Sequence, residues 1–218
     1  MKHCIGFVGY ECEDIILYLA ECISVYGMRI AIEDRTEYGM VLQILEHDQR
    51  ATAKEPETEL EYHKICISTM PVTKEEYDVI FLVFGYRLQH PKMFECETLI
   101  MVTDDLPAHA KILRKVGKWE RKQILMIRNC IEISGKTDYL QFLTHQKFEQ
   151  IYCVPWEERD RKVRCALGTE DGAKVYRLSA GMIMILQELL KILLPEISEE
   201  FIQRIGRKGR RGITTWGS

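Results

Sequence analysis

Short apolar runs alternate along the chain with segments whose apolar residues recur at helical spacing. Nearly continuous apolar runs are typical of strands that are buried on both faces of a sheet. The pattern predicts strands at 4–8, 28–34, 63–69, 78–84, 97–103, 122–129 and 148–156. It predicts helices at 15–27, 36–45, 106–117, 134–146, 158–168, 178–194 and 196–206. Strands alternating with helices indicate an α/β fold with a doubly wound, mostly parallel sheet, helices on both faces and a helical C-terminus.

The same pattern predicts one domain and one long loop. From Glu46 to Glu59 the only apolar side chains are alanines, which predicts an exposed loop. Two strands, 63–69 and 78–84, are joined by a short link. We expect a single α/β domain over residues 1–195, followed by a C-terminal helix and basic tail over 196–218.

Composition excludes several classes of protein. A net charge of -3 argues against general nucleic-acid binding. The eight cysteines include no C-x-x-C pair, so we expect reduced thiols and neither a disulfide framework nor a zinc site. The longest apolar stretch, at 182–194, is too short and too polar to span a membrane. Because the first strand begins at once, without a basic region and apolar run before it, we expect a cytoplasmic protein.

The turn after the first strand has the position of a phosphate-binding loop. Its residues are Gly9, Tyr10, Glu11, Cys12, Glu13 and Asp14. A working loop needs glycines for close backbone approach, a lysine for the phosphates and a hydroxyl for the metal. This turn has one glycine, no lysine and three acids, which would repel phosphate from a helix N-terminus. We interpret it as the fold of a nucleotide-switch ATPase without its chemistry.

A second candidate site lies at the end of the second strand. Glu33 and Asp34 follow Gly9 by about twenty-five residues, which is where a dinucleotide-binding domain keeps the acid for its ribose. The glycine pattern before them is incomplete, and the plain alternative is a solvated, acidic strand end. An NAD-binding or other nucleotide-using enzyme is therefore the alternative reading of this chain.

The remaining motifs are weaker evidence for a phosphate, metal or catalytic site. Residues 134–137 read Ser-Gly-Lys-Thr, like the end of a Walker A motif, but Cys130 stands where that motif needs glycine, which favours coincidence. The six histidines show no metal spacing, and no serine has the setting of a nucleophile elbow. We therefore expect no catalytic residue of this kind, no metal site and no bound cofactor.

The last predicted helix ends in a basic segment. Its candidate contact residues are Arg204, Arg207, Lys208, Arg210, Arg211 and Trp216. Cations at a helix C-terminus complement the helix dipole, which is a purely structural role. The same group is suited to docking an acidic protein partner or an anionic membrane surface. Nucleic acid is the least favoured partner.

Taken in order, these segments resemble the MinD and ParA group of deviant P-loop ATPases, which includes the CpaE and TadZ proteins of pilus assembly. Residues 18–34 resemble the family's first helix and second strand, and 97–116 its characteristic strand and following helix. By this resemblance, Asn129 corresponds to the family's strand-end Asn and Pro155 to its adenine-loop proline. The resemblance implies a P-loop NTPase-like fold, with Glu33, Asp34, Asn129 and Pro155 as candidate nucleotide contacts.

The departures from the family fall on its catalytic parts. Cys12 stands where the loop lysine belongs, and Glu13 and Asp14 stand where its Thr or Ser residues belong. Val83 stands where the family keeps its Walker B Asp. Losing these groups together removes charge neutralisation at the phosphates, which is nearly all of phosphoryl-transfer catalysis. The short link between 63–69 and 78–84 also departs from the family, and it leaves open whether a crossover helix covers that face.

The resemblance therefore implies a pseudo-ATPase that serves as a scaffold or localisation adaptor, by analogy in a pilus or secretion assembly. Family members pair face to face across the nucleotide site, so we expect a homodimer or pairing with an active paralogue. A third hypothesis is an adaptor that binds nucleotide without hydrolysing it.

Overall fold

The computed structural model describes residues 3–46, 58–130, 136–167 and 178–209. The described strands form one eight-stranded sheet in the order β3-β4-β2-β5-β1-β6-β7-β8. The strands are β1 (His3–Gly9), β2 (Ile30–Asp34), β3 (Glu59–Tyr62), β4 (Ile65–Ser68), β5 (Val79–Gly85), β6 (Thr98–Asp104), β7 (Lys122–Cys130) and β8 (Gln150–Pro155). β3 pairs antiparallel with β4, and the other pairings are parallel. The predicted doubly wound, mostly parallel sheet is confirmed.

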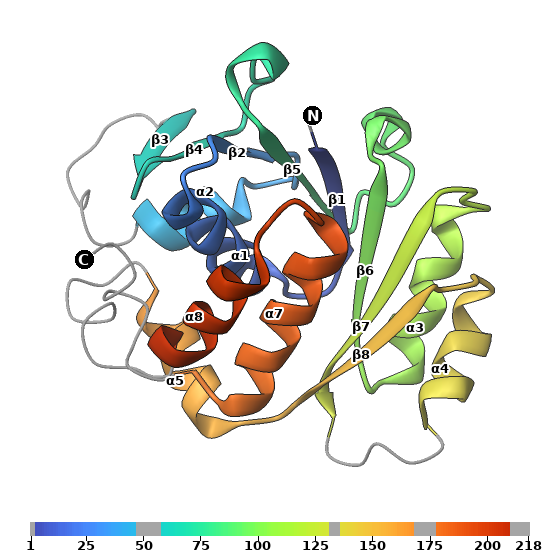
Figure 1. The fold of residues 1–218 in the computed structure, drawn as a ribbon. Helices are drawn as coiled ribbons and strands as arrows, with labels where there is room; N and C mark the ends of the chain where they lie inside the picture. Colours follow the sequence, from blue (N-terminus) through green and yellow to red (C-terminus); the bar gives the residue numbers. More distant parts are fainter. Residues whose placement is uncertain (1–2, 47–57, 131–135, 168–177, 210–218) are drawn as a thin grey trace.

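Helices cover both faces of this sheet, as Figure 1 shows. The α-helices are α1 (Glu13–Tyr26), α2 (Met40–Glu46), α3 (Pro107–Ile112), α4 (Lys136–Thr144), α5 (Glu158–Ala166), α7 (Ala180–Leu193) and α8 (Glu199–Gly209). Short 3-10 turns are η1 (Lys74–Glu76), η2 (Pro91–Glu95) and η3 (Leu113–Val116). α1, α2, α5, α7 and α8 lie on one face, and α3 and α4 lie on the other.

Alternating side chains of the strands divide the core into two clusters. On β5, Phe81 and Val83 belong to the cluster beneath α1 and α7, while Leu82 and Phe84 belong to the cluster beneath α3 and α4. Each face of a parallel sheet must be covered because both carry apolar side chains. This explains why the strands read as almost unbroken apolar runs.

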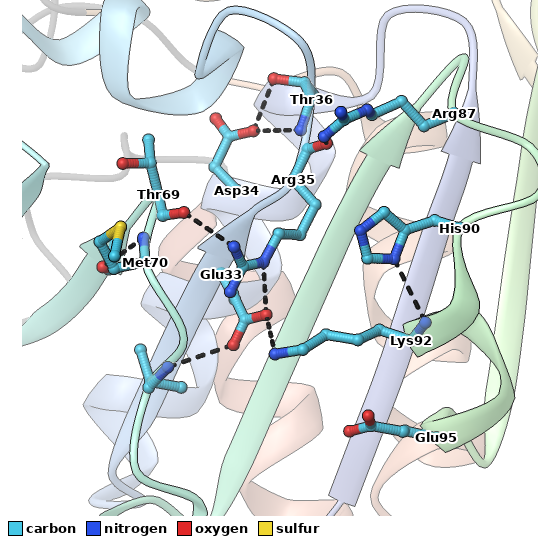
Figure 2. A network of polar contacts seen from close by, with 12 residues as sticks. Glu33, Asp34, Arg35, Thr36, Thr69, Met70, Arg87, His90, Lys92 and Glu95 are labelled. Carbon is cyan, nitrogen blue, oxygen red and sulfur yellow. Dashed lines mark hydrogen bonds and ion pairs between the residues drawn. The ribbon is translucent and has the colours of Figure 1, made fainter.

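The connection from β4 to β5 contains η1 and no α-helix. β4 and β5 lie on either side of β2, so this link of residues 69–78 must cross over β2. Because it is so short, the face over β2 and β5 is covered by the segments around η1 and η2 instead of a helix. Beneath these segments this part of the sheet carries a polar network, shown in Figure 2.

One predicted segment differs from the structure. The sequence predicts an exposed loop up to Glu59 and a strand from His63, whereas the structure has strand β3, then a turn at His63 and Lys64, then β4. Both turn residues have positive φ, of 50° and 66°. Such two-residue hairpins normally show Asn or Gly there, so the His-Lys pair concealed the turn. Residues 47–57 of the predicted loop lie outside the described residues.

The C-terminal helix α8 shares the main core. Phe201, Ile202 and Ile205 are buried in the same cluster as α1 and α7. None of the described helices combines the length and the apolar character that crossing a bilayer requires.

Candidate functional site

The loop between β1 and α1 is held tightly against β6. Gly9 has φ 110°, and a Cβ placed there would lie 2.0 Å from the carbonyl oxygen of Val102. The next amide, of Tyr10, donates to that same oxygen at 2.9 Å. Glu11 also has positive φ, of 35°. The one glycine of the loop therefore serves close packing of the loop on β6.

A buried arginine occupies the inside of this loop. Arg128, near the end of β7, donates through Nη1 and Nη2 to the two carboxylate oxygens of Asp14 at 2.6 and 2.9 Å. It also donates to the backbone carbonyl of Glu11. The two side chains are only 7% and 1% exposed. Burial disfavours the charged guanidinium, but the Asp14 carboxylate outweighs this and raises the pKa of Arg128.

A second arginine closes the loop from outside. Arg164 on α5 pairs with the carboxylate of Glu11 and approaches that of Glu13 at 3.5 Å. Burial acts to lower the pKa of Arg164, but the bond to Glu11 and the charges of Asp14 and Glu11 together raise it. Burial raises the pKa of the Glu13 carboxyl. The three acids predicted to repel phosphate thus have internal cationic partners, neither of which the sequence analysis singled out.

The positions that the resemblance gives to catalytic groups hold core side chains. Cys12 is 2% exposed and precedes α1 without a side-chain cap bond, and burial raises the pKa of its thiol. Val83 is 1% exposed and lies in the apolar cluster beneath α1. Neither position offers a cation for phosphates or an oxygen ligand for magnesium. No group of three metal-ligating side chains occurs within the described residues.

Beside the loop, three side chains form a further cluster that sequence reasoning missed. The ring of Tyr10 stacks on that of His109 with centroids 5.1 Å apart. His109 Nδ1 lies 2.8 Å from a carboxylate oxygen of Asp104, at the end of β6. Asp104 ends β6 and Tyr10 follows the adjacent strand β1, so the parallel register brings them to one edge of the sheet. The five-residue spacing of Asp104 and His109 was the only sequence signal for this pair.

Glu33 and Asp34 point to opposite faces of the sheet, as Figure 2 shows. Asp34 accepts from the Thr36 hydroxyl at 2.6 Å and from the Val41 amide at 2.6 Å, which fixes the start of α2. Glu33 accepts from Arg35 at 2.6 Å and from Lys92 at 2.7 Å. Both residues are almost fully buried. Their carboxylates are therefore turned to internal partners.

The network around Glu33 keeps its carboxylate charged. Burial acts to raise its pKa, but the hydrogen bonds from Arg35, Lys92 and the Val72 amide together lower the pKa of Glu33. Strand β2 is separated from β1 by β5, so Glu33 and Asp34 lie two strands away from the loop.

Asn129 and Pro155 lie at the carboxyl ends of β7 and β8. Cys130 pairs with Pro155 across an irregularity in the register, and Asn129 within it has φ 58°. Asn129 directly follows Arg128, so the structure brings it near the loop. Residues 134–135 lie outside the described residues, and Lys136 begins α4.

The basic segment is described only in part. Arg204 on α8 is exposed, and its guanidinium lies 4.9 Å from the centre of the Phe201 ring. Arg207 and Lys208 belong to α8, while Arg210, Arg211 and Trp216 lie outside the described residues. The apolar residues of α8 are buried against the core, so the docked helix offers its polar side to solvent.

Comparisons with solved structures identify the fold, whereas sequence comparisons find no relative. No protein-family description matches the sequence, and no curated protein is significantly similar to it. Among solved structures, a ParA family ATPase from Chlorobium tepidum TLS is 10% identical, with a TM-score of 0.50 over 95% of this chain and 97% of that one. A putative plasmid partition protein from Borrelia burgdorferi B31, bound to AMPPNP, is 11% identical, with a TM-score of 0.58 over 90% of this chain and 100% of that one. A chain of the MinC:MinD cell division protein complex from Aquifex aeolicus is 10% identical, with a TM-score of 0.49 over 94% of this chain and 95% of that one. The chain has the α/β fold of ParA-type P-loop ATPases.

Proposed function

We propose that this chain is a non-catalytic, ParA/MinD-like pseudo-ATPase that acts as a scaffold or localisation adaptor. The observation that carries the proposal is the pair of internal ion pairs, Arg128 with Asp14 and Arg164 with Glu11, at the phosphate-loop position. In a working loop, backbone amides and cations face the phosphates. Here the cations that reach the loop face the loop's own carboxylates.

Nucleotide binding at this place would require the pairs to break. Removing one partner from a buried ion pair costs about 3–5 kcal/mol, and a triphosphate would also meet the charges of the displaced carboxylates. The Walker positions provide no compensating group, since Cys12 and Val83 are buried and uncharged. Phosphoryl transfer depends on positioning and charge neutralisation, which this arrangement lacks.

A scaffold also needs a surface for partners, and the carboxyl edge of the sheet offers one. Large side chains are exposed after four strands of this edge: Tyr38 at 67%, Tyr86 at 51%, Leu106 at 51% and Trp156 at 48%. Exposed apolar groups gathered on one side of a protein mark interaction surfaces. We propose that this edge pairs with a second copy or with an active relative, by analogy within a pilus or secretion assembly.

The test measures hydrolysis and association on the same samples. We expect ATP turnover with magnesium to stay at the background of buffer alone. Sedimentation at rising protein concentration, alone and with a candidate paralogue, should show association that is equal with and without ATP. Turnover that disappears in an Asp14→Ala variant, or a monomer at every concentration and with every paralogue, would overturn the proposal.

A further inference from the structure

A pocket of about 590 Å³ lies between the residues that follow β5 and the end of α3 with η3. One wall is the continuous segment 86–90, and the other is provided by Ile112 and Lys115. The proposed scaffold function uses only Tyr86 of this lining, as one of the exposed side chains at the carboxyl edge of the sheet. Its volume lies within the range of small-molecule sites, about 300–1,000 Å³.

The ionisable side chains that line this pocket can donate hydrogen bonds to an anion. Arg87 and Lys115 are cationic, and His90 accepts the amide of Lys92 through Nδ1 at 3.2 Å. That bond leaves the proton of the neutral ring on Nε2, where it can be donated. None of the described residues lining the pocket carries a carboxylate. The pocket is therefore matched in charge to an anion.

Hydrogen bonds hold two of these donors, Arg87 and His90, in place. Arg87 Nη1 donates to the carbonyl of Arg35 at 3.1 Å, and Figure 2 shows Arg87 and His90 beside the Glu33 network. The carboxylate of that network is already paired with Arg35 and Lys92. Burial first, and then the nearby arginines, lower the pKa of His90. The part of this shift that the arginines cause is the expected effect of nearby positive charges.

The rest of the lining suits a flat organic group. Leu88 and Ile112 are apolar, and the Tyr86 ring is 51% exposed at one end of the segment. Aromatic rings in such positions stack on planar ligands. We propose that this pocket binds a phosphomonoester of a planar group, with the phosphate on Arg87, Lys115 and His90 and the ring against Tyr86.

The experiment is an NMR titration of the full chain, followed through the backbone amides of residues 86–90. The probes are AMP, phenyl phosphate and inorganic phosphate, each without magnesium. We expect saturable shifts in this segment, with an organic phosphate binding more tightly than the inorganic ion. Stronger binding of AMP identifies a nucleoside ligand, and stronger binding of phenyl phosphate identifies a phosphoaryl one; both support the pocket.

A pair of charge reversals makes the assignment specific. Lys115→Glu is expected to weaken binding by about tenfold or more, since it replaces a charge-assisted donor by a repelling charge. Lys118→Glu changes the net charge equally at an exposed residue outside the pocket lining. Equal affinity in the two variants, shifts confined to the loop at 9–14, or no saturable change with any probe would overturn the inference. Equal affinity or no saturable change would leave the proposed scaffold function standing, whereas shifts confined to the loop would count against both proposals.

Discussion

Replacing Arg128 with methionine is expected to lower the free energy of unfolding by about 3–5 kcal/mol. The variant leaves the carboxylate of Asp14 without its bidentate partner at a place where that residue is 1% exposed. It also removes the donor to the Glu11 carbonyl. Domains of this kind are stable by about 5–15 kcal/mol, so the loss is a large share of the total. Urea unfolding followed by circular dichroism measures it.

Two companion variants separate the ion pair from general damage. Arg164→Met removes a pair whose side chains are 27% and 38% exposed, so we expect a loss of about 1 kcal/mol. Asp14→Leu combined with Arg128→Met replaces both charges by apolar groups and should recover most of the lost stability. An Arg128→Met protein as stable as its parent, or a double variant less stable than Arg128→Met alone, would contradict this account of the loop.

Gly9→Ala is expected to cost about 2–5 kcal/mol, the sum of a strained backbone and a forced overlap. The new Cβ would lie 2.0 Å from the Val102 carbonyl oxygen, at φ 110°. That oxygen accepts the Tyr10 amide, so moving it disturbs the contact between β1 and β6. The loss is again measured by urea unfolding.

The matched control is Gly27→Ala. Gly27 ends α1 with a similar φ of 102°, but nothing lies within 4 Å of an added Cβ. This variant carries the backbone strain alone, about 1–2 kcal/mol. The difference between the two variants measures the overlap at Gly9. If Gly9→Ala were no more destabilising than Gly27→Ala, the loop would not be packed against β6 as described.

Most of the sheet was predictable because parallel strands are buried on both faces and leave apolar runs in the sequence. Strand β3 was not predicted, since it is an edge strand with glutamates on its exposed side and a turn of unusual residues after it. Its burial pattern alternates between exposed and half-buried positions, which apolar content alone does not reveal.

The site was predictable only as a set of acids. Glu11, Glu13 and Asp14 lie within four residues of one another and indicate a loop that repels phosphate. Their cationic partners lie 114 residues away, for Asp14 with Arg128, and 153 residues away, for Glu11 with Arg164. Such long-range pairs depend on strand order, which no local sequence pattern reveals. The one visible signal was a charged Arg128 inside an apolar strand.

The most direct test of the central claim is a thermal-shift titration with ATP, ADP, GTP and NAD, with and without magnesium, on the parent protein and on Lys115→Glu. A ligand that binds the folded state raises the melting temperature with its concentration relative to its dissociation constant. Because Lys115→Glu is expected to weaken binding in the pocket beside β5 about tenfold or more, a shift that persists at the same ligand concentration in this variant reports on the rest of the protein. The account predicts no magnesium-dependent shift in this variant with any of the four ligands. A magnesium-dependent rise in melting temperature with ATP that persists in Lys115→Glu would contradict the account, because it would mean that the ion pairs at Asp14 and Glu11 break when nucleotide binds.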